Sequence, residues 1–248
     1  MNGLLLIHAF PLDARMWSPQ LGGPRAVAPS LPGFGGTAPA ADGVMTMGEA
    51  AGRCVDALDA AGIDRAVVCG LSVGGYVAFE LWRTARSRIA GLVLANTRSE
   101  PDAAEARAAR VALAERLRRE GNVLADSPPP LLSPEAPDEM RGWIRELIAD
   151  QPAEAIAAAS LGMAERPDSG PDLPSIDVPT LVVTSDRDEL IPMSVSAPMA
   201  DAIPGAELAV IAGAGHLSNV ERPEEFSALL SRHLERCGGP DLLPSGGS

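Results

Sequence analysis

The sequence contains no lysine, because all 20 of its basic residues are arginines. A Schiff base on a protein amine and a phosphate-binding P-loop both need a lysine, so this chain can form neither. Basic charge is scarce as well, since 33 acidic residues leave a formal net charge of −13. A chain with that charge binds nucleic acids and anionic membranes poorly. We therefore expect no nucleic acid and no membrane as partners.

Cysteines and long apolar runs are also few. The three cysteines, Cys54, Cys69 and Cys237, are odd in number and have no spacing typical of a disulfide framework or a metal site. We expect reduced, mostly buried thiols in a cytoplasmic protein, no metal and no other cofactor. No apolar run approaches the roughly 18–20 residues of a membrane span. Residues 1–8 lack the basic start and the cleavage site of a signal peptide, and we interpret them as a buried strand.

Short apolar runs alternate with helical patterns along most of the chain. A length of 248 residues with 46% hydrophobic residues is enough for one large α/β domain. Continuous apolar runs of this kind predict parallel strands covered on both faces. The predicted strands are residues 4–7, 25–28, 66–69, 91–95, 180–184 and 207–211. A capping box at Thr46 and Glu49 opens a helix, and the last helix is predicted over residues 223–236.

The pattern changes between residues 99 and 172. This stretch has no strand-like run and reads as helices near residues 102–120, 138–149 and 152–163. About 70 residues are too many for an ordinary crossover connection. We predict a helical lid over residues 99–172, inserted into a core made of residues 1–98 and 173–237. The composition of residues 238–248 predicts a disordered tail.

The motif Gly70-x-Ser72-x-Gly74 stands between an apolar run and a helical segment. This is the spacing of a nucleophile elbow, a tight strand-to-helix turn that exposes the serine hydroxyl. Small residues on both sides let the strand and the helix approach each other. The alternative is a glycine-rich turn with an ordinary serine. The strand before the motif and the helix after it favour the elbow.

A serine hydroxyl needs a base to take its proton, and only three histidines are present. His216 lies in a glycine-rich loop just after the last predicted strand, and the carboxyl end of a strand is where an α/β site assembles. It is the candidate base. His233, among charged residues of the last helix, is expected to be solvated. His8 is expected to make structural hydrogen bonds.

The remaining parts of such a site are an acid and an oxyanion hole. The acid should follow a strand between the serine and the histidine in sequence, and both Asp186 and Asp188 do so. An exposed acidic loop is the alternative for either one. The oxyanion hole needs two backbone N–H donors. We predict Val73, directly after the serine, and Phe10, in the loop after the first strand.

Several stretches together resemble the α/β-hydrolase family over nearly the whole chain. They are residues 6–13, 31–35, 70–75, 188–192 and 213–216. The resemblance implies the α/β-hydrolase fold, with a mostly parallel sheet of about six strands. It also favours Asp188 as the acid, because Pro192 follows at the family's spacing. Residues 96–102 and 161–168 look like those of small bacterial carboxylesterases that prefer short acyl chains, and enol-lactonases and perhydrolases look similar.

Three features depart from the family pattern. Ala9 replaces the usual glycine beside the oxyanion loop, and Ser185 stands where the acid motif has glycine. Only seven residues precede His8, where the family normally has a β-hairpin. We therefore expect either a minimal sheet without that hairpin or a protein whose true start lies upstream of residue 1. The outer strand of the minimal sheet would be residues 25–28, bracketed by Pro24 and Pro29, which would blunt unwanted pairing.

These observations predict a serine hydrolase that cleaves short-chain carboxylic esters through an acyl-enzyme, with Ser72, His216 and Asp188 as its triad. Enol-lactone hydrolysis or perhydrolysis on the same triad is the second reading. A non-catalytic ligand receptor is the third, and the intact triad opposes it. The predicted substrate pocket contains Met140, Trp143, Leu161, Met163 and Leu217. The expected partner is a small-molecule ester, and the protein is expected to be a monomer or a small homo-oligomer.

Overall fold

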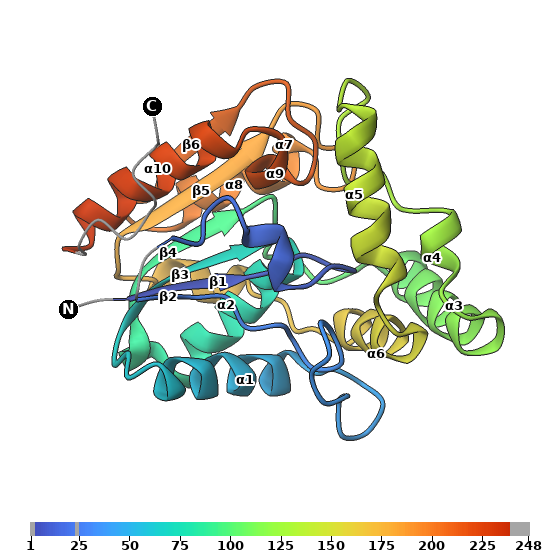
Figure 1. Ribbon diagram of the computed structural model, residues 1–248. Helices are drawn as coiled ribbons and strands as arrows, with labels where there is room; N and C mark the ends of the chain where they lie inside the picture. Colours follow the sequence, from blue (N-terminus) through green and yellow to red (C-terminus); the bar gives the residue numbers. More distant parts are fainter. Residues whose placement is uncertain (1–2, 23–24, 239–248) are drawn as a thin grey trace.

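A computed structural model describes residues 3–22 and 25–238, and a single parallel sheet runs through them (Figure 1). The strand order is β2-β1-β3-β4-β5-β6, and each neighbouring pair is parallel. The strands are β1 (Gly3–Ile7), β2 (Ala26–Val27), β3 (Ala66–Leu71), β4 (Ile89–Ala95), β5 (Thr180–Ser185) and β6 (Glu207–Ile211). The predicted fold class and the predicted number of strands are confirmed.

Helices cover both faces of the sheet because its strands are apolar on both sides. In β1, Leu5 and Ile7 belong to the buried cluster under α1 and α2. Leu4 and Leu6, which point the other way, belong to the cluster under α10. Figure 1 shows α1 and α2 on one side of the sheet and α10 on the other. The core helices are α1 (Met47–Ala60), α2 (Val73–Thr84), α7 (Met193–Ser196), α8 (Pro198–Ala202), α9 (Ser218–Glu221) and α10 (Pro223–Arg236).

The strand order places a crevice between the ends of β1 and β3. From β1 the chain moves outward to β2, and it then returns to add β3 on the opposite side of β1. Connections therefore leave these two neighbouring strands in opposite directions. In open α/β sheets such a switch point opens a crevice at the carboxyl ends of the strands, where ligands bind. Here the two ends carry Phe10 and Ser72.

The strand predicted at the edge of the sheet does lie there. β2 covers Ala26–Val27 and pairs with β1, and the sheet order ends at β2. Pro29 lies two residues beyond it. Pro24 lies outside the described residues, as does the predicted tail apart from Gly238.

Four helices are inserted between β4 and β5, within residues 99–172. They are α3 (Ala104–Glu120), α4 (Val123–Asp126), α5 (Asp138–Ala149) and α6 (Ala153–Ala164). In Figure 1 they form a group to one side of the sheet, with α3 packed along α6. None of the helices formed by residues 3–22 and 25–238 has the length and apolarity needed to cross a membrane.

The prediction that His233 is solvated was wrong. Its side chain is 2% exposed and lies on the buried face of α10 with Phe226, Leu230 and Leu234. Residues spaced by three and four share one face of a helix, so His233 is carried inward by its position despite its charged neighbours in sequence. Burial, aided by the nearby Arg236 guanidinium, lowers the pKa of His233 to about 4.

Candidate active site

Ser72 occupies a strained turn between β3 and α2. Its backbone has φ 58° and ψ −116°, a region that residues other than glycine rarely adopt. A Cβ atom at Gly70 would overlap the Gly74 carbonyl, and one at Gly74 would overlap the Ile7 carbonyl. The Ser72 N–H donates to the Ala95 carbonyl over 2.9 Å. The two glycines thus permit the close approach of strand and helix on which the sharp turn depends.

His216 and Asp188 face each other at the ends of β6 and β5. The Nδ1 of His216 lies 2.9 Å from Oδ2 of Asp188, and both side chains are buried. The other oxygen of Asp188 accepts hydrogen bonds of 2.9 Å from the N–H groups of Leu190 and Ile191. Burial alone would raise the pKa of Asp188, but the contact with His216 and the hydrogen bonds from the Ile191 N–H and the Asn96 side chain hold it below its ordinary value. A carboxylate fixed in this way orients Nδ1–H inward and leaves Nε2 available as a base.

Asp186 points elsewhere. Its Oδ1 accepts the Gly213 N–H over 2.7 Å, and the residue is exposed. The two acids proposed for the same role therefore have different partners, and Asp188 is the one that contacts His216.

Asn96 is a member of this network that the sequence analysis did not single out. Its Nδ2 donates to Asp188 Oδ2 over 2.9 Å and to Ser185 Oγ over 2.7 Å, while its Oδ1 accepts from Ser218 Oγ. Asn96 follows β4, the neighbour of β5, and has a positive φ of 44°. A polar residue directly after the neighbouring strand was the available signal. Ser185, a departure from the family pattern, supplies one of the acceptors that hold Asn96.

A cavity of about 190 Å³ joins the serine to the histidine. Ser72 and His216 both line it. Phe10 lines it from the loop after β1. Val73, the second predicted oxyanion donor, is the first residue of α2, where amides have no carbonyl partner within the helix. The other lining residues are Tyr76, Arg98, Arg110, Pro129, Leu131, Met163, Leu190 and Ile191.

Of the five residues predicted for the pocket, Met163 lines this cavity. Met140 and Trp143 instead pack against the apolar cluster on the α10 side of the sheet, and Leu217 is buried in that cluster. Leu161 packs against the opposite cluster. These four predictions do not match the cavity. The sequence shows that these side chains are large. It does not show which of them faces the serine, because that depends on how each segment is oriented in the fold.

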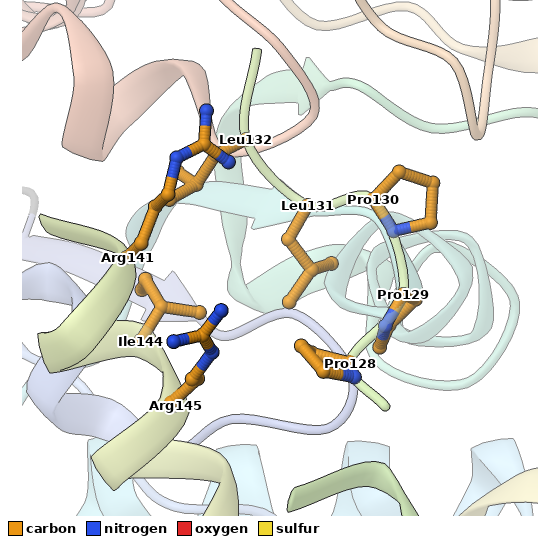
Figure 2. A pocket seen from close by; sticks show the side chains of 8 residues that line it. All are labelled: Pro128, Pro129, Pro130, Leu131, Leu132, Arg141, Ile144 and Arg145. Carbon is orange, nitrogen blue, oxygen red and sulfur yellow. The ribbon is translucent and has the colours of Figure 1, made fainter. Parts of the chain in front are cut away.

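A second cavity of about 160 Å³ lies beside the first, on the segment of residues 128–132 (Figure 2). Pro129 and Leu131 line both cavities. Figure 2 shows Arg141 and Arg145 of α5 across the hollow from Pro128 and Pro129. This segment therefore acts as a partition between the two spaces.

The partition is tied to the loop that carries His216. The Leu131 carbonyl accepts the Leu217 N–H over 2.9 Å. The buried carboxylate of Glu221 accepts from the N–H groups of Ser133 and Gly215 over 3.0 and 2.7 Å, and from the Ser133 hydroxyl. The inserted segment and the histidine loop are thus held in one hydrogen-bonded unit.

His8 supports the loop after β1. Its Nε2 accepts the Leu31 N–H over 2.9 Å, which places the ring proton on Nδ1, where it donates to the Ala9 carbonyl over 3.0 Å. Burial lowers the pKa of His8 to about 4, because a charged ring would be desolvated and a proton on Nε2 would break the bond to Leu31. The contacts agree with the structural role expected for His8.

The sheet, the inserted helices and the serine turn define an α/β hydrolase. The model of the alpha/beta hydrolase family matches residues 4–229, and the chain belongs to this family.

Named relatives in this family are hydrolases of several kinds. A RutD protein of Variovorax paradoxus, described as a candidate carbamate hydrolase, is 30% identical over 97% of this chain and 94% of its own. A thermophilic esterase from Thermogutta terrifontis, in a malate-bound structure, is 39% identical with a TM-score of 0.90, covering 96% of this chain and 90% of its own. An enol-lactonase from Burkholderia xenovorans is 26% identical with a TM-score of 0.82, covering 95% of this chain and 92% of its own. These relatives support a hydrolase activity.

Proposed function

We propose that this protein is a serine hydrolase that cleaves short-chain carboxylic esters through an acyl-enzyme. The observation that carries the proposal is the placement of Ser72 and His216 on one cavity, with Nδ1 of His216 held by Asp188 at 2.9 Å. The strained serine turn supports the same role, because it exposes a hydroxyl at the start of a helix. The likeness to the Thermogutta esterase adds independent support.

The proposed reaction proceeds in two halves on the same residues. Ser72 Oγ attacks the acyl carbon while His216 Nε2 takes the hydroxyl proton. The backbone N–H groups of Val73 and Phe10 stabilise the oxyanion, and Asp188 balances the charge of the protonated ring. His216 then gives its proton to the leaving alcohol. Water, deprotonated by His216, attacks the acyl-enzyme and releases the acid, which restores Ser72.

The size of the cavity supports a preference for short acyl chains. About 190 Å³ is small beside the roughly 300–1,000 Å³ of pockets that bind drug-sized ligands. Phe10, Leu131, Met163 and Ile191 would surround the acyl group and exclude water. The inserted helices would serve as a cap, because α6 and the segment of residues 128–132 supply part of this wall.

An acyl-chain series tests the proposal. Purified protein should hydrolyse p-nitrophenyl acetate and butyrate faster than the octanoate and dodecanoate, in terms of kcat/KM. Faster turnover of the dodecanoate would contradict the short-chain preference. Release of p-nitrophenol from none of the esters by a folded sample would contradict the esterase itself and favour the ligand-receptor reading.

Lactone hydrolysis is the second candidate, favoured by the likeness to the Burkholderia enol-lactonase. The same triad would open a cyclic ester, and the leaving alcohol would stay attached to the acid. A comparison of kcat/KM for a lactone and an open-chain ester of equal carbon number separates the two. A higher value for the lactone would make ring opening the main activity.

A further inference from the structure

We propose that the ester substrate carries a carboxylate, which binds to the guanidinium group of Arg98 beside the catalytic serine. This inference rests on the proposed function and deepens it. It starts from the charge balance of the cavity lined by Ser72 and His216. Arg98 and Arg110 line this cavity, and its lining, within the part of the chain described, includes no Asp or Glu.

Arg110 already has a carboxylate partner. Its Nε forms an ion pair with Asp102, a buried residue that is not part of the cavity lining. Asp102 also binds Arg166 over 2.8 Å, and the Arg166 guanidinium stacks 4.2 Å above the ring of Tyr76, another lining residue. Burial would raise the pKa of Asp102, but hydrogen bonds from Arg166 and Arg110 lower it to about 2. One ionised carboxylate therefore serves two guanidinium groups.

Arg98 has no such partner. Its Nη2 donates to the Leu190 carbonyl over 3.2 Å. Its Nε is buried and meets no hydrogen-bond acceptor in residues 3–22 and 25–238, and within these ranges the guanidinium forms no ion pair. The residue is half-buried among the apolar side chains of Leu190, Ile191 and Leu131. A charge in such surroundings is costly unless an anion pairs with it.

Asp188 also lies beside the catalytic histidine, and its oxygens are taken by His216, Asn96 and two backbone N–H groups. It cannot neutralise Arg98 without giving up these bonds. The excess of positive charge stands out in a protein with a net charge of −13.

A carboxylate suits Arg98 better than a phosphate does. The guanidinium is planar and pairs with a carboxylate through two parallel N–H···O bonds. A single unpaired guanidinium balances a monoanion, whereas a dianionic phosphate would keep an uncompensated charge in an apolar cavity. The carboxylate can belong to the acyl part or to the alcohol part of the ester. The experiment therefore tests each position with its own pair of esters.

The first measurement compares isosteric esters on the wild-type protein by proton release. Methyl hydrogen succinate and methyl succinamate differ only by a carboxylate in place of a neutral amide, and they test the acyl side. O-acetyl-lactate and O-acetyl-lactamide test the alcohol side. Charged hydrogen bonds of this kind correspond to a preference of about 10- to 100-fold. We expect that preference in kcat/KM for the charged member of at least one pair, and equal values in both pairs would overturn the proposal.

The second measurement uses Arg98→Gln and Arg98→Lys, with Arg53→Gln as the control. The amide introduced by Arg98→Gln can still donate to the Leu190 carbonyl, while Arg53 is exposed on α1, away from the cavity. Arg98→Gln should lose the preference mainly through KM, so that the charged and the neutral ester of a pair have similar values of kcat/KM. Arg98→Lys should keep part of the preference, and Arg53→Gln all of it. An equal loss on charged and neutral esters in both Arg98 variants would show that Arg98 only supports the Leu190 loop.

Calorimetry separates a failure of this proposal from a failure of the proposed function. Succinate and acetyl-lactate are titrated into Ser72→Ala and into Ser72→Ala/Arg98→Gln. At least one should bind about 10-fold or more weakly to the double variant, whether or not the wild type hydrolyses any ester. Equal binding of both compounds to the two variants would refute the anion site. If the two variants bind equally and the wild type still hydrolyses neutral esters, the anion site is refuted while the proposed esterase activity is retained.

Discussion

At the residue scale, Asp188 and Asp186 lie two positions apart after β5 and make different contacts. Asp188 binds His216, whereas Asp186 binds the Gly213 N–H at the surface. Asp188→Asn should lower kcat for ester hydrolysis by roughly 10⁴-fold, as amide substitution does in serine proteases, because the ring tautomer is no longer fixed. Asp186→Asn keeps an acceptor oxygen and should change kcat less than threefold. Steady-state kinetics of the two variants would contradict the assignment if Asp186→Asn were the impaired one.

The sequence was enough to propose the three residues that the structure brings to one place, but not the residues that support them. Ser72 has a fixed motif, and His216 and Asp188 stand in loops directly after apolar runs. Asn96 and Arg98 lie in residues 96–102, a stretch that resembles small bacterial carboxylesterases, but the resemblance gave neither residue a role. Their roles depend on β4 lying beside β5 and on the direction of each side chain, which are properties of the assembled sheet.

At the element scale, the segment of residues 128–132 separates two cavities, and Leu131 is its buried side chain (Figure 2). Leu131→Ala should connect the two spaces and raise the ratio of octanoate to butyrate turnover several-fold. It should also lower the free energy of unfolding by about 2–5 kcal/mol, as large-to-small substitutions in cores do. Leu132→Ala is the matched control, because Leu132 lines the second cavity alone. An unchanged chain-length profile in Leu131→Ala would show that Leu131 does not limit the acyl chain.

The elements themselves were predicted well. The helix expected over residues 138–149 is α5 with the same bounds, and the one expected over 102–120 is α3 from Ala104 to Glu120. Helix-forming residues and local stop signals, such as Gly121 after α3, carry that information. The part of the inserted segment that meets the serine was not predictable, because it depends on how α3 and α6 pack together.

At the scale of the whole molecule, two buried neutral histidines link stability to pH. His8 and His233 have pKa values of about 4 in the folded chain, against 6.5 for an ordinary histidine. As the pH falls from about 6.5 to 4, the unfolded chain binds protons that the folded chain does not, so stability is lost in this window. Above about pH 7.5 neither histidine contributes to the slope. Each shift corresponds to at most about 3 kcal/mol.

Urea unfolding at pH 7.5, 6.5, 5.5 and 4.5 measures this slope. The free energy of unfolding should fall by less than about 1 kcal/mol from pH 7.5 to 6.5 and more steeply from pH 6.5 to 4.5. His233→Leu should reduce the slope by about half, whatever its stability at pH 7.5. A free energy that is flat from pH 6.5 to 4.5 would mean that these histidines take up protons in the folded protein.

The role of Ser72 as the nucleophile is the central claim, and covalent labelling tests it most directly. A fluorophosphonate should add to the wild-type protein once, with loss of fluoride, and peptide mass spectrometry should place the adduct on Ser72. The exposed Ser194 provides a control variant, Ser194→Ala, which should label and hydrolyse p-nitrophenyl butyrate as the wild type does. Ser72→Ala should fold normally, take up no label and lose on the order of 10⁴- to 10⁶-fold in turnover. An adduct on another residue, or a tenth of the wild-type turnover in folded Ser72→Ala, would contradict the account.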